Sequence, residues 1–366
     1  MQGPITCARV TGIVLATVVA AGCGSGRKDG AVATRVDSLV AAFQRQSSAP
    51  GISVAVVRAG RDTLVLRGYG LADAENGVPA TPETVYAIAS VTKQFTAAAV
   101  LQLAQDGRLS LDDPVGRYLP ALPAELRPLL VRQLLNHTSG VPEHTVLLAD
   151  EVSPDSVVAL AAREPPAFTP GTQWAYSNVG YLILGMLVER VSGEPYARYL
   201  ETRVFRPAGL AATRHCGVEG LIPHRARGYE LHDTLVNAPY NSPTPLFAAG
   251  ALCSTAGDLA AWNRALATGR VVAPGWLARM TTPEGAAREK GYGYGLIVAR
   301  VDGRRIFGHS GQFAGFRSAN LYLPDDSLSV TVLSNLASES VEDLSLSIVR
   351  AALAGAGPHP AARPAR

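Results

Sequence analysis

The chain has 366 residues, of which 47% are hydrophobic and 17% are charged, and its net charge is +3. This is a globular composition with ample length for a large core, so one large domain or two lobes is expected. The thirty arginines are scattered along the chain. The sequence therefore lacks the clustered basic surface that marks nucleic-acid binding.

The N-terminus has the pattern of an export signal. Arg9 precedes an uncharged run, residues 10–21, which is too short to span a bilayer but has the length of a secretory hydrophobic region. The run ends in AAGC, with the cysteine at Cys23, and this resembles a bacterial lipobox. We therefore expect a lipoprotein-type signal peptide over residues 1–22; an ordinary secreted protein cut nearby is the alternative.

This signal predicts where the mature protein resides. Lipidation of Cys23 would anchor it in the cell envelope after export across the inner membrane, in the periplasm, on the outer membrane or at the cell surface. Residues 23–30 are rich in glycine, serine and charge, and are predicted to form a flexible tether. The lipid anchor would be the only membrane contact, and the sequence leaves the oligomeric state open.

The remaining elements follow from periodicity and turn residues. The predicted segments, in chain order, are a helix over 31–46, strands over 52–57 and 62–69 joined by a turn at 59–60, a helix from Ser90 to Gly107, a helix over 179–191, a helix over 254–268, strands over 293–299, 304–309, 318–323 and 327–334, a helix over 339–354, and a disordered tail over 356–366.

Strands at both ends of the chain and helices between them predict a mixed α/β (α+β) fold. The first and last strands would meet in one antiparallel sheet flanked by helices, with a mostly helical lobe inserted. We expect a single domain over 31–355. Its sheet lobe would comprise about 31–85 and 254–355, and its helical lobe about 86–253. A cleft between two lobes is a common place for an active site.

The stretch YAIASVTKQFT contains a serine and a lysine, Ser90 and Lys93, that share one face of a helix. A serine needs a base to take its proton, and lysine serves only when neutral. The apolar run that follows predicts burial, which lowers the pKa of an ammonium group, and the start of a helix also disfavours positive charge. The chain has only three lysines, and arginine cannot be deprotonated. Lys93 is therefore a candidate general base, although such a pair also occurs on solvated helix faces.

Two further motifs follow in the chain. Tyr176-Ser177-Asn178 precedes the helix over 179–191, and His309-Ser310-Gly311 lies among the last strands. Either motif alone also fits a helix cap or a hairpin bend. Together with Ser90-x-x-Lys93, they resemble the serine β-lactamases and penicillin-binding proteins. Segments such as LLNHTSG and GHSGQFAGF place the resemblance in the class C-type branch, with D-aminopeptidases, D,D-peptidases and esterases, over about residues 36–355.

This resemblance implies a role for each motif residue. Ser90 would be the acylated nucleophile, Lys93 or Tyr176 would be the general base, and Tyr176 would protonate the leaving group. Backbone N–H groups of Ser90 and Gln312 would form the oxyanion hole. The implied substrate-binding residues are Asn178, His309, Ser310 and Gly311. Neither a metal nor an organic cofactor is implied.

His309 departs from the β-lactamase pattern, which has lysine there. A neutral histidine carries no charge for an anionic antibiotic. The expected function is therefore a serine hydrolase that acts on an ester, an amide or a D-amino-acid peptide, with a small molecule or peptide as substrate. The alternatives are a β-lactamase or D,D-carboxypeptidase proper, and a catalytically idle cell-wall-binding protein.

Four cysteines are present, and Cys7 leaves with the predicted signal. If Cys23 is lipidated, Cys216 and Cys253 remain. In an oxidising compartment they can form a disulfide. Two separate buried thiols fit the sequence equally well.

Overall fold

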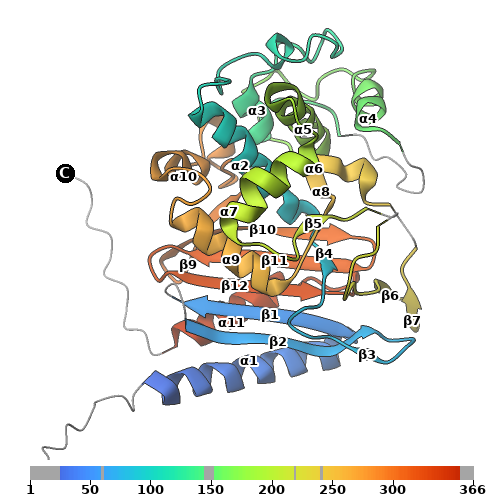
Figure 1. Ribbon diagram of the computed structural model, residues 1–366, viewed down its shortest axis with the longest axis vertical. Coiled ribbons are helices and arrows are strands. Elements are labelled where there is room, and N and C mark those ends of the chain that lie inside the picture. The colour runs from blue at the N-terminus through green and yellow to red at the C-terminus, as the bar shows by residue number, and fades with distance from the viewer. Residues whose placement is uncertain (1–24, 59–61, 144–151, 218–219, 240–241, 355–366) are drawn as a thin grey trace, which may run out of the picture.

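The computed structural model describes residues 25–58, 62–143, 152–217, 220–239 and 242–354 (Figure 1). The predicted signal peptide and Cys23, the turn at 59–60 and the tail over 356–366 lie outside these residues. Seven strands form one antiparallel sheet in the order β3-β2-β1-β12-β11-β10-β9. Their bounds are β1 Gly51–Arg58, β2 Asp62–Asp73, β3 Val78–Pro79, β9 Ile297–Val301, β10 Arg304–Phe313, β11 Phe316–Leu323 and β12 Leu328–Ser334.

The first and last strands meet in the middle of this sheet. β1 pairs antiparallel with β12, in a register that places Ile52 opposite Ser334 and Val56 opposite Val330. Both strands are rich in valine, whose branched side chain suits a pleated surface that is covered on both faces. This confirms the predicted antiparallel sheet built from the two ends of the chain.

Helices cover both faces of the sheet (Figure 1). Because successive side chains point to opposite faces, Val54 and Val56 of β1 pack in one core with α1 (Ser25–Ser47) and α11 (Glu342–Leu353). Ala55, between them, packs in the other core, which also contains α9 (Ala256–Ala267) and the helical lobe. The result is a three-layer arrangement with the sheet in the middle.

The helical lobe is built around α2 (Thr92–Gln105), which is buried on nearly every side. A helix that is apolar all round belongs in the interior of a large domain. Around α2 lie α5 (Asn178–Ser192) and α8 (Phe247–Gly250). The remaining described α-helices are short: α3 Val131–Leu135, α4 Pro154–Ala161, α6 Tyr196–Tyr199, α7 Arg206–Ala208 and α10 Pro274–Met280.

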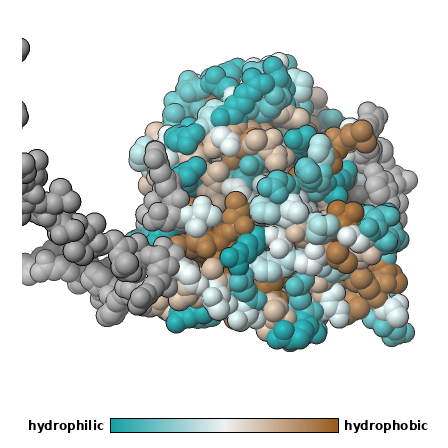
Figure 2. Space-filling model, turned by 60° about the horizontal axis from the view of Figure 1, so that its bottom comes forward, coloured by the Kyte–Doolittle hydropathy of each residue, from teal (hydrophilic) through white to brown (hydrophobic). Residues whose placement is uncertain are grey.

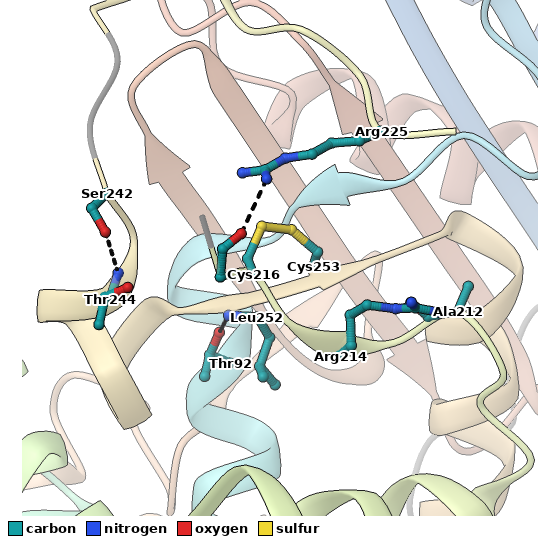
Figure 3. Close-up of a disulfide and its surroundings, with 10 residues drawn as sticks. Thr92, Ala212, Arg214, Cys216, Arg225, Ser242, Thr244, Leu252 and Cys253 are labelled. Carbon is teal, nitrogen blue, oxygen red and sulfur yellow. Dashed lines mark hydrogen bonds between the residues drawn. A yellow bond between two sulfur atoms is a disulfide. The ribbon is translucent and has the colours of Figure 1, made fainter. Parts of the chain in front are cut away.

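Two small sheets complete the structure. One has the order β4-β8-β5, and the other is the hairpin β6–β7; their bounds are β4 Tyr86–Ala87, β5 Arg214–His215, β6 Tyr229–Leu231, β7 Leu235–Asn237 and β8 Leu252–Ser254. A disulfide joins Cys216, just after β5, to Cys253 in β8, and both cysteines are fully buried (Figure 3). This settles the alternative that the sequence left open.

Three predicted segments differ from the structure. Residues 25–30, expected to belong to a flexible tether, are the first turns of α1. The helix expected from Ser90 begins with a 3₁₀ turn over Ala89–Val91 and becomes α-helical at Thr92.

The strand expected over 293–299 occupies 297–301 instead. Gly295, inside the predicted strand, has a positive φ angle of 68°, which an extended strand cannot contain, and Gly291 just before it has 61°. At Gly295 a Cβ atom would lie 2.6 Å from the carbonyl oxygen of Lys93, so this glycine lets the loop lie against the start of α2.

Figure 2 shows one face of the molecule, on which apolar areas alternate with hydrophilic ones. The large hydrophobic side chains that are exposed among the described residues are Leu66, Val78, Leu221, Leu235, Val236 and Ile297. None of the described helices combines the length and apolar character needed to cross a bilayer.

Candidate active site

Ser90 lies in the 3₁₀ turn that leads into α2, and its position is held by both lobes. The preceding residue, Ala89, has a φ of 47°, a conformation that non-glycine residues adopt at a cost. Ile88 anchors the turn from two sides, because its N–H donates to Leu252 O of β8 (2.9 Å) and its carbonyl accepts from Ser318 Oγ of β11 (2.8 Å). The strained turn is therefore fixed before any substrate arrives.

The disulfide lies close to this turn, because both cysteines belong to one buried cluster with Ala87 and Ala89. Cys253 belongs to β8, whose Leu252 N–H donates to Thr92 Oγ1 over 3.2 Å. Thr92 stands between Ser90 and Lys93 in the first turn of α2. The crosslink thus tethers the strand that supports the Ser90–Lys93 segment.

Lys93 is completely buried and its ammonium nitrogen has three neighbours. Nζ lies 3.2 Å from Ser90 Oγ, 2.7 Å from Asn178 Oδ1 and 2.7 Å from Ala249 O. Burial lowers the pKa of Lys93 to about 7, and the carboxylate of Glu143 opposes this shift. A neutral amine donates two hydrogen bonds and accepts one. Its two N–H groups match Asn178 and Ala249, and its lone pair matches the hydroxyl of Ser90.

Tyr176 approaches the same place from the segment before α5. Its ring centroid lies 4.8 Å from Lys93 Nζ. Its hydroxyl oxygen is buried and has no hydrogen-bond partner of good geometry among the described residues. Burial raises the pKa of Tyr176 well above 10, and the nearby Ser90 hydroxyl only partly offsets this. The side chain is therefore a neutral phenol at pH 7, suited to giving a proton rather than taking one.

Asn178 does not present a free side chain to the cleft. Its Oδ1 accepts from Lys93, and its Nδ2 donates to Glu143 Oε1 over 2.7 Å. The backbone N–H of Asn178, at the start of α5, donates to Glu143 Oε2 over 2.6 Å. Glu143 thus places a negative charge at the positive end of a helix, where it is favoured, and beside the amide that was expected to bind substrate.

His309 is also held within the protein rather than free for a substrate. It is buried in β10, with Nδ1 2.5 Å from Ser310 O and Nε2 2.9 Å from the hydroxyl of Tyr292. Burial first, and then the charge of Lys93, lower the pKa of His309 to about 3. The ring is therefore neutral, with the Nδ1 proton donated to the carbonyl and Nε2 accepting from Tyr292. Both ring nitrogens are in use in this state, so the role of His309 in substrate binding stays a prediction.

The strand β10 brings the third motif against Ser90. Gly311 packs on the 3₁₀ turn so closely that a Cβ there would lie 2.4 Å from Ile88 O. β9 pairs with β10 only as far as Gly308, so the edge of β10 from His309 onward is not covered by β9. This leaves a strand edge beside the nucleophile to which a substrate backbone can hydrogen-bond.

These residues line a cleft of about 420 Å³. It brings together six of the residues predicted from the motifs: Ser90, Tyr176, His309, Ser310, Gly311 and Gln312. Lys93 and Asn178 are linked to it through their hydrogen bonds. The cleft is also lined by residues that the motifs did not indicate, namely Trp174, Lys290, Tyr292, Ile297, Arg317 and Glu342.

Glu143 is the most important residue that sequence reasoning missed. It stands three residues after Gly140, at the end of the LLNHTSG segment, and nothing in its local pattern distinguishes it from a surface glutamate. Its proximity to Asn178, 35 positions away, arises only from the packing of that loop on α5. Among the residues that the structure describes, no group of three or more histidine, cysteine, aspartate or glutamate side chains is arranged to hold a metal.

Comparison with known proteins now decides the family. The family described as Beta-lactamase matches residues 36–354. The chain belongs to this family. Among curated relatives, the putative penicillin-binding protein PbpX of Bacillus subtilis is 28% identical over 77% of this chain and 69% of its own length. Protein flp of Staphylococcus aureus is 28% identical over 85% of this chain, which spans only 64% of that protein.

Solved structures extend the likeness of this Beta-lactamase family member. A D-amino acid amidase from Ochrobactrum anthropi SV3, in complex with L-phenylalanine amide, superposes with a TM-score of 0.78 at 26% identity, over 90% of this chain and 99% of that one. A D-stereospecific amidohydrolase from Streptomyces sp. gives 0.75 at 29% identity, over 90% and 99%. An octameric penicillin-binding protein homologue from Pyrococcus abyssi gives 0.77 at 28% identity, over 90% and 78%. The predicted family and fold are confirmed, and the chain is a serine hydrolase.

Proposed function

We propose that the protein hydrolyses amides of amino acids and short peptides that have a free α-ammonium group, through an acyl-enzyme on Ser90. The observation that carries the proposal is the carboxylate of Glu143, which is hydrogen-bonded to Asn178, the partner of Lys93. A carboxylate in this place attracts a cationic acyl group and repels an anionic one. The relatives solved as D-amino acid amidase and D-stereospecific amidohydrolase support the D-series as substrates.

The geometry supports a proton path for acylation. Neutral Lys93 accepts the Ser90 proton as Oγ forms a bond to the substrate carbonyl carbon, and backbone N–H groups of Ser90 and Gln312 receive the oxyanion. The phenol of Tyr176 then gives its proton to the amine nitrogen as the C–N bond breaks, and Lys93 returns a proton to Tyr176. Water then attacks the ester carbon while Lys93 takes a proton from it. As the bond from that carbon to Ser90 Oγ breaks, Lys93 returns the proton to Oγ, which releases the acid and restores the enzyme.

This assignment gives the two candidate bases different tasks. The pKa of Lys93 is lowered to about 7, so a large fraction is neutral at that pH, whereas the pKa of Tyr176 is raised. A phenolate at Tyr176 would therefore be costly, and a neutral lysine is available. We assign the base to Lys93 and the acid to Tyr176.

A second candidate function is favoured by the basic residues of the cleft. Lys290 and Arg317 line the same cleft as Ser310, and either cation can bind a carboxylate on the leaving group. This supports a D,D-carboxypeptidase or a β-lactamase, despite the neutral ring of His309. The two candidates differ in the end of the substrate that carries the recognised charge.

A substrate panel separates these functions. We expect D-phenylalanine amide to be cleaved faster than N-acetyl-D-phenylalanine amide, nitrocefin and acyl-D-Ala-D-Ala. Glu143→Gln should lower kcat/KM for the free ammonium substrate by about 10- to 100-fold, the range of a charge-assisted hydrogen bond, and leave the N-acetyl substrate within a few-fold. Faster cleavage of acyl-D-Ala-D-Ala would favour the second candidate.

A probe experiment addresses the idle-protein alternative. A fluorophosphonate should label the wild-type protein and fail to label Ser90→Ala. Failure to label the wild type, with no turnover of the panel, would refute an enzymatic role for Ser90.

We also propose that the protein is exported and lipid-anchored in the cell envelope through Cys23. The hydrophobic run over 10–21 and the AAGC sequence support this, and the Cys216–Cys253 disulfide fits an oxidising compartment. Metabolic labelling with a radioactive fatty acid should mark the wild type and not Cys23→Ala. Labelling of both would reject the lipid anchor at this residue.

A further inference from the structure

His137 is a buried, titratable side chain for which the proposed proton path has no use. It follows α3, is 1% exposed, and has a φ of 61°, a left-handed conformation that a histidine adopts at a cost. The surrounding loop is held from two sides, since Thr138 N–H donates to Gln133 O (2.9 Å) and Gly171 N–H donates to Thr138 O (2.7 Å). A strained conformation held this firmly calls for a functional explanation.

His137 binds the backbone on both sides of Tyr176. Its carbonyl oxygen accepts from Ala175 N–H over 3.0 Å, and its ring nitrogen Nδ1 accepts from Ser177 N–H over 3.2 Å. Its ring centroid lies 4.4 Å from that of Tyr176, at a tilt of 38°. One residue therefore fixes the main chain before Tyr176, the main chain after it, and one face of its ring.

These contacts require the neutral form of the histidine. Nδ1 accepts a hydrogen bond, so the single ring proton is on Nε2, which is buried and has no hydrogen-bond partner among the described residues. The rings of Tyr181 and Tyr292, at 5.2 and 4.7 Å, enclose it. Burial first, and then the charge of Lys93, lower the pKa of His137 well below 6.5, which keeps the ring uncharged and the acceptor available.

Tyr176 needs such support because the Ser90 hydroxyl near its tip makes no well-aligned hydrogen bond with it. Its hydroxyl has no hydrogen-bond partner of good geometry among the described residues, so the direction of the phenol is set by its backbone and by ring packing. Displacement of a catalytic group by about 1 Å can cost about 100-fold in rate. The residue that fixes the Tyr176 backbone therefore controls proton transfer at Ser90.

We propose that His137 is the positioning residue for Tyr176, which it holds in place through neutral Nδ1, its carbonyl oxygen and its ring. The proposal rests on the proton path described above, in which Tyr176 protonates the leaving group. It distinguishes substrates by their leaving group, because an amine must receive a proton to depart and p-nitrophenolate need not.

The test compares two substrates in two variants. His137→Phe keeps an aromatic ring and removes the Nδ1 acceptor, whereas His137→Asn supplies a side-chain oxygen near the position of Nδ1 and tolerates positive φ. We expect His137→Phe to lower kcat/KM for a D-amino acid amide by about 100-fold, within the range of general acid catalysis. Its kcat/KM for a p-nitrophenyl ester should fall by less than about 10-fold. His137→Asn should recover most of the amide activity.

A double-mutant cycle adds an independent readout. In a Tyr176→Phe background, His137→Phe should cause little further loss of amide activity, because both changes remove the same function. Equal losses on amide and ester, full additivity with Tyr176→Phe, or no recovery in His137→Asn would each overturn the proposal. If His137→Phe fails to fold, the deciding quantity is the ratio of kcat/KM on the amide to kcat/KM on the ester in His137→Asn. A fall of more than tenfold in this ratio, relative to the wild type, would count against the proposal. Failure of the proposed function itself would appear separately, as absent amide turnover in the wild type.

Discussion

Replacing Lys93 with methionine should change how the stability of the protein depends on pH. Methionine fills a similar volume without an ionisable group. The pKa of Lys93 is lowered from 10.5 to about 7 in the folded protein. At about 1.36 kcal/mol for each unit, the folded state disfavours the ammonium by about 5 kcal/mol relative to the unfolded chain.

The sign of the effect follows from proton binding. Below pH 7 both states hold the proton, and the full penalty opposes folding. Between pH 7 and 10.5 the unfolded chain holds more protons than the folded one, so the free energy of unfolding rises with pH. From pH 7 to 9.5 the wild type should gain about 3 kcal/mol relative to Lys93→Met. The hydrogen bonds lost to Asn178 and Ala249 give an offset that is independent of pH.

Urea unfolding, followed by tryptophan fluorescence at pH 7, 8, 9 and 9.5, measures this difference directly. Lys290→Met is the matched control, because Lys290 is exposed in the same cleft and should leave the wild-type slope unchanged. Lys93→Met should also abolish activity. Parallel stability curves for wild type and Lys93→Met would show that Lys93 titrates with an ordinary pKa, and the assignment of the base would fall with it.

Three further predictions concern catalysis and stability. First, kcat/KM for an amide should rise with pH through about 7, because neutral Lys93 is the base; a flat profile from pH 6 to 9 would contradict this. Second, Gly311→Ala should lower labelling by a fluorophosphonate more than tenfold, because its Cβ would lie 2.4 Å from Ile88 O; unchanged labelling would show that the turn can relax. Third, a Cys216→Ser/Cys253→Ser variant should lose about 4 kcal/mol of stability, the value for a crosslink that closes a loop of this length, and a loss under 1 kcal/mol in denaturant titrations would argue for a strained native bond.

The sheet and the motif residues could be predicted from the sequence for a physical reason. Short valine-rich segments bounded by turn residues lie at the two ends of the chain, and such segments predict strands that can join in one sheet. Ser90 and Lys93 could be placed together because residues three positions apart on one helix share a face. The burial of Lys93 was predictable from the apolar residues that follow it, and the structure gives it no exposed surface.

The sequence could not predict which polar groups would already have partners. Asn178 and His309 were expected to bind a substrate. In the structure the side chain of Asn178 is hydrogen-bonded to Glu143, and the ring of His309 is hydrogen-bonded to Tyr292. These partners come from segments that no local pattern connects to the motifs. Only the two backbone contacts around Tyr176 show what the place of His137 in its loop accomplishes.

The pairing of β1 with β12 has a consequence for how the chain folds. One edge of β1 stays open until residues near the C-terminus have been made, so the central strand pair forms late and has high contact order. Until then the unpaired, valine-rich edge of β1 can pair with another chain and aggregate. This favours keeping the chain unfolded, or protected by another protein, during synthesis. Because α1 packs against α11, the two ends of the domain lie close together. A circular permutant opened at an exposed loop of the helical lobe would make β12 and β1 consecutive strands, separated only by α11 and α1, and it should fold faster than the natural chain.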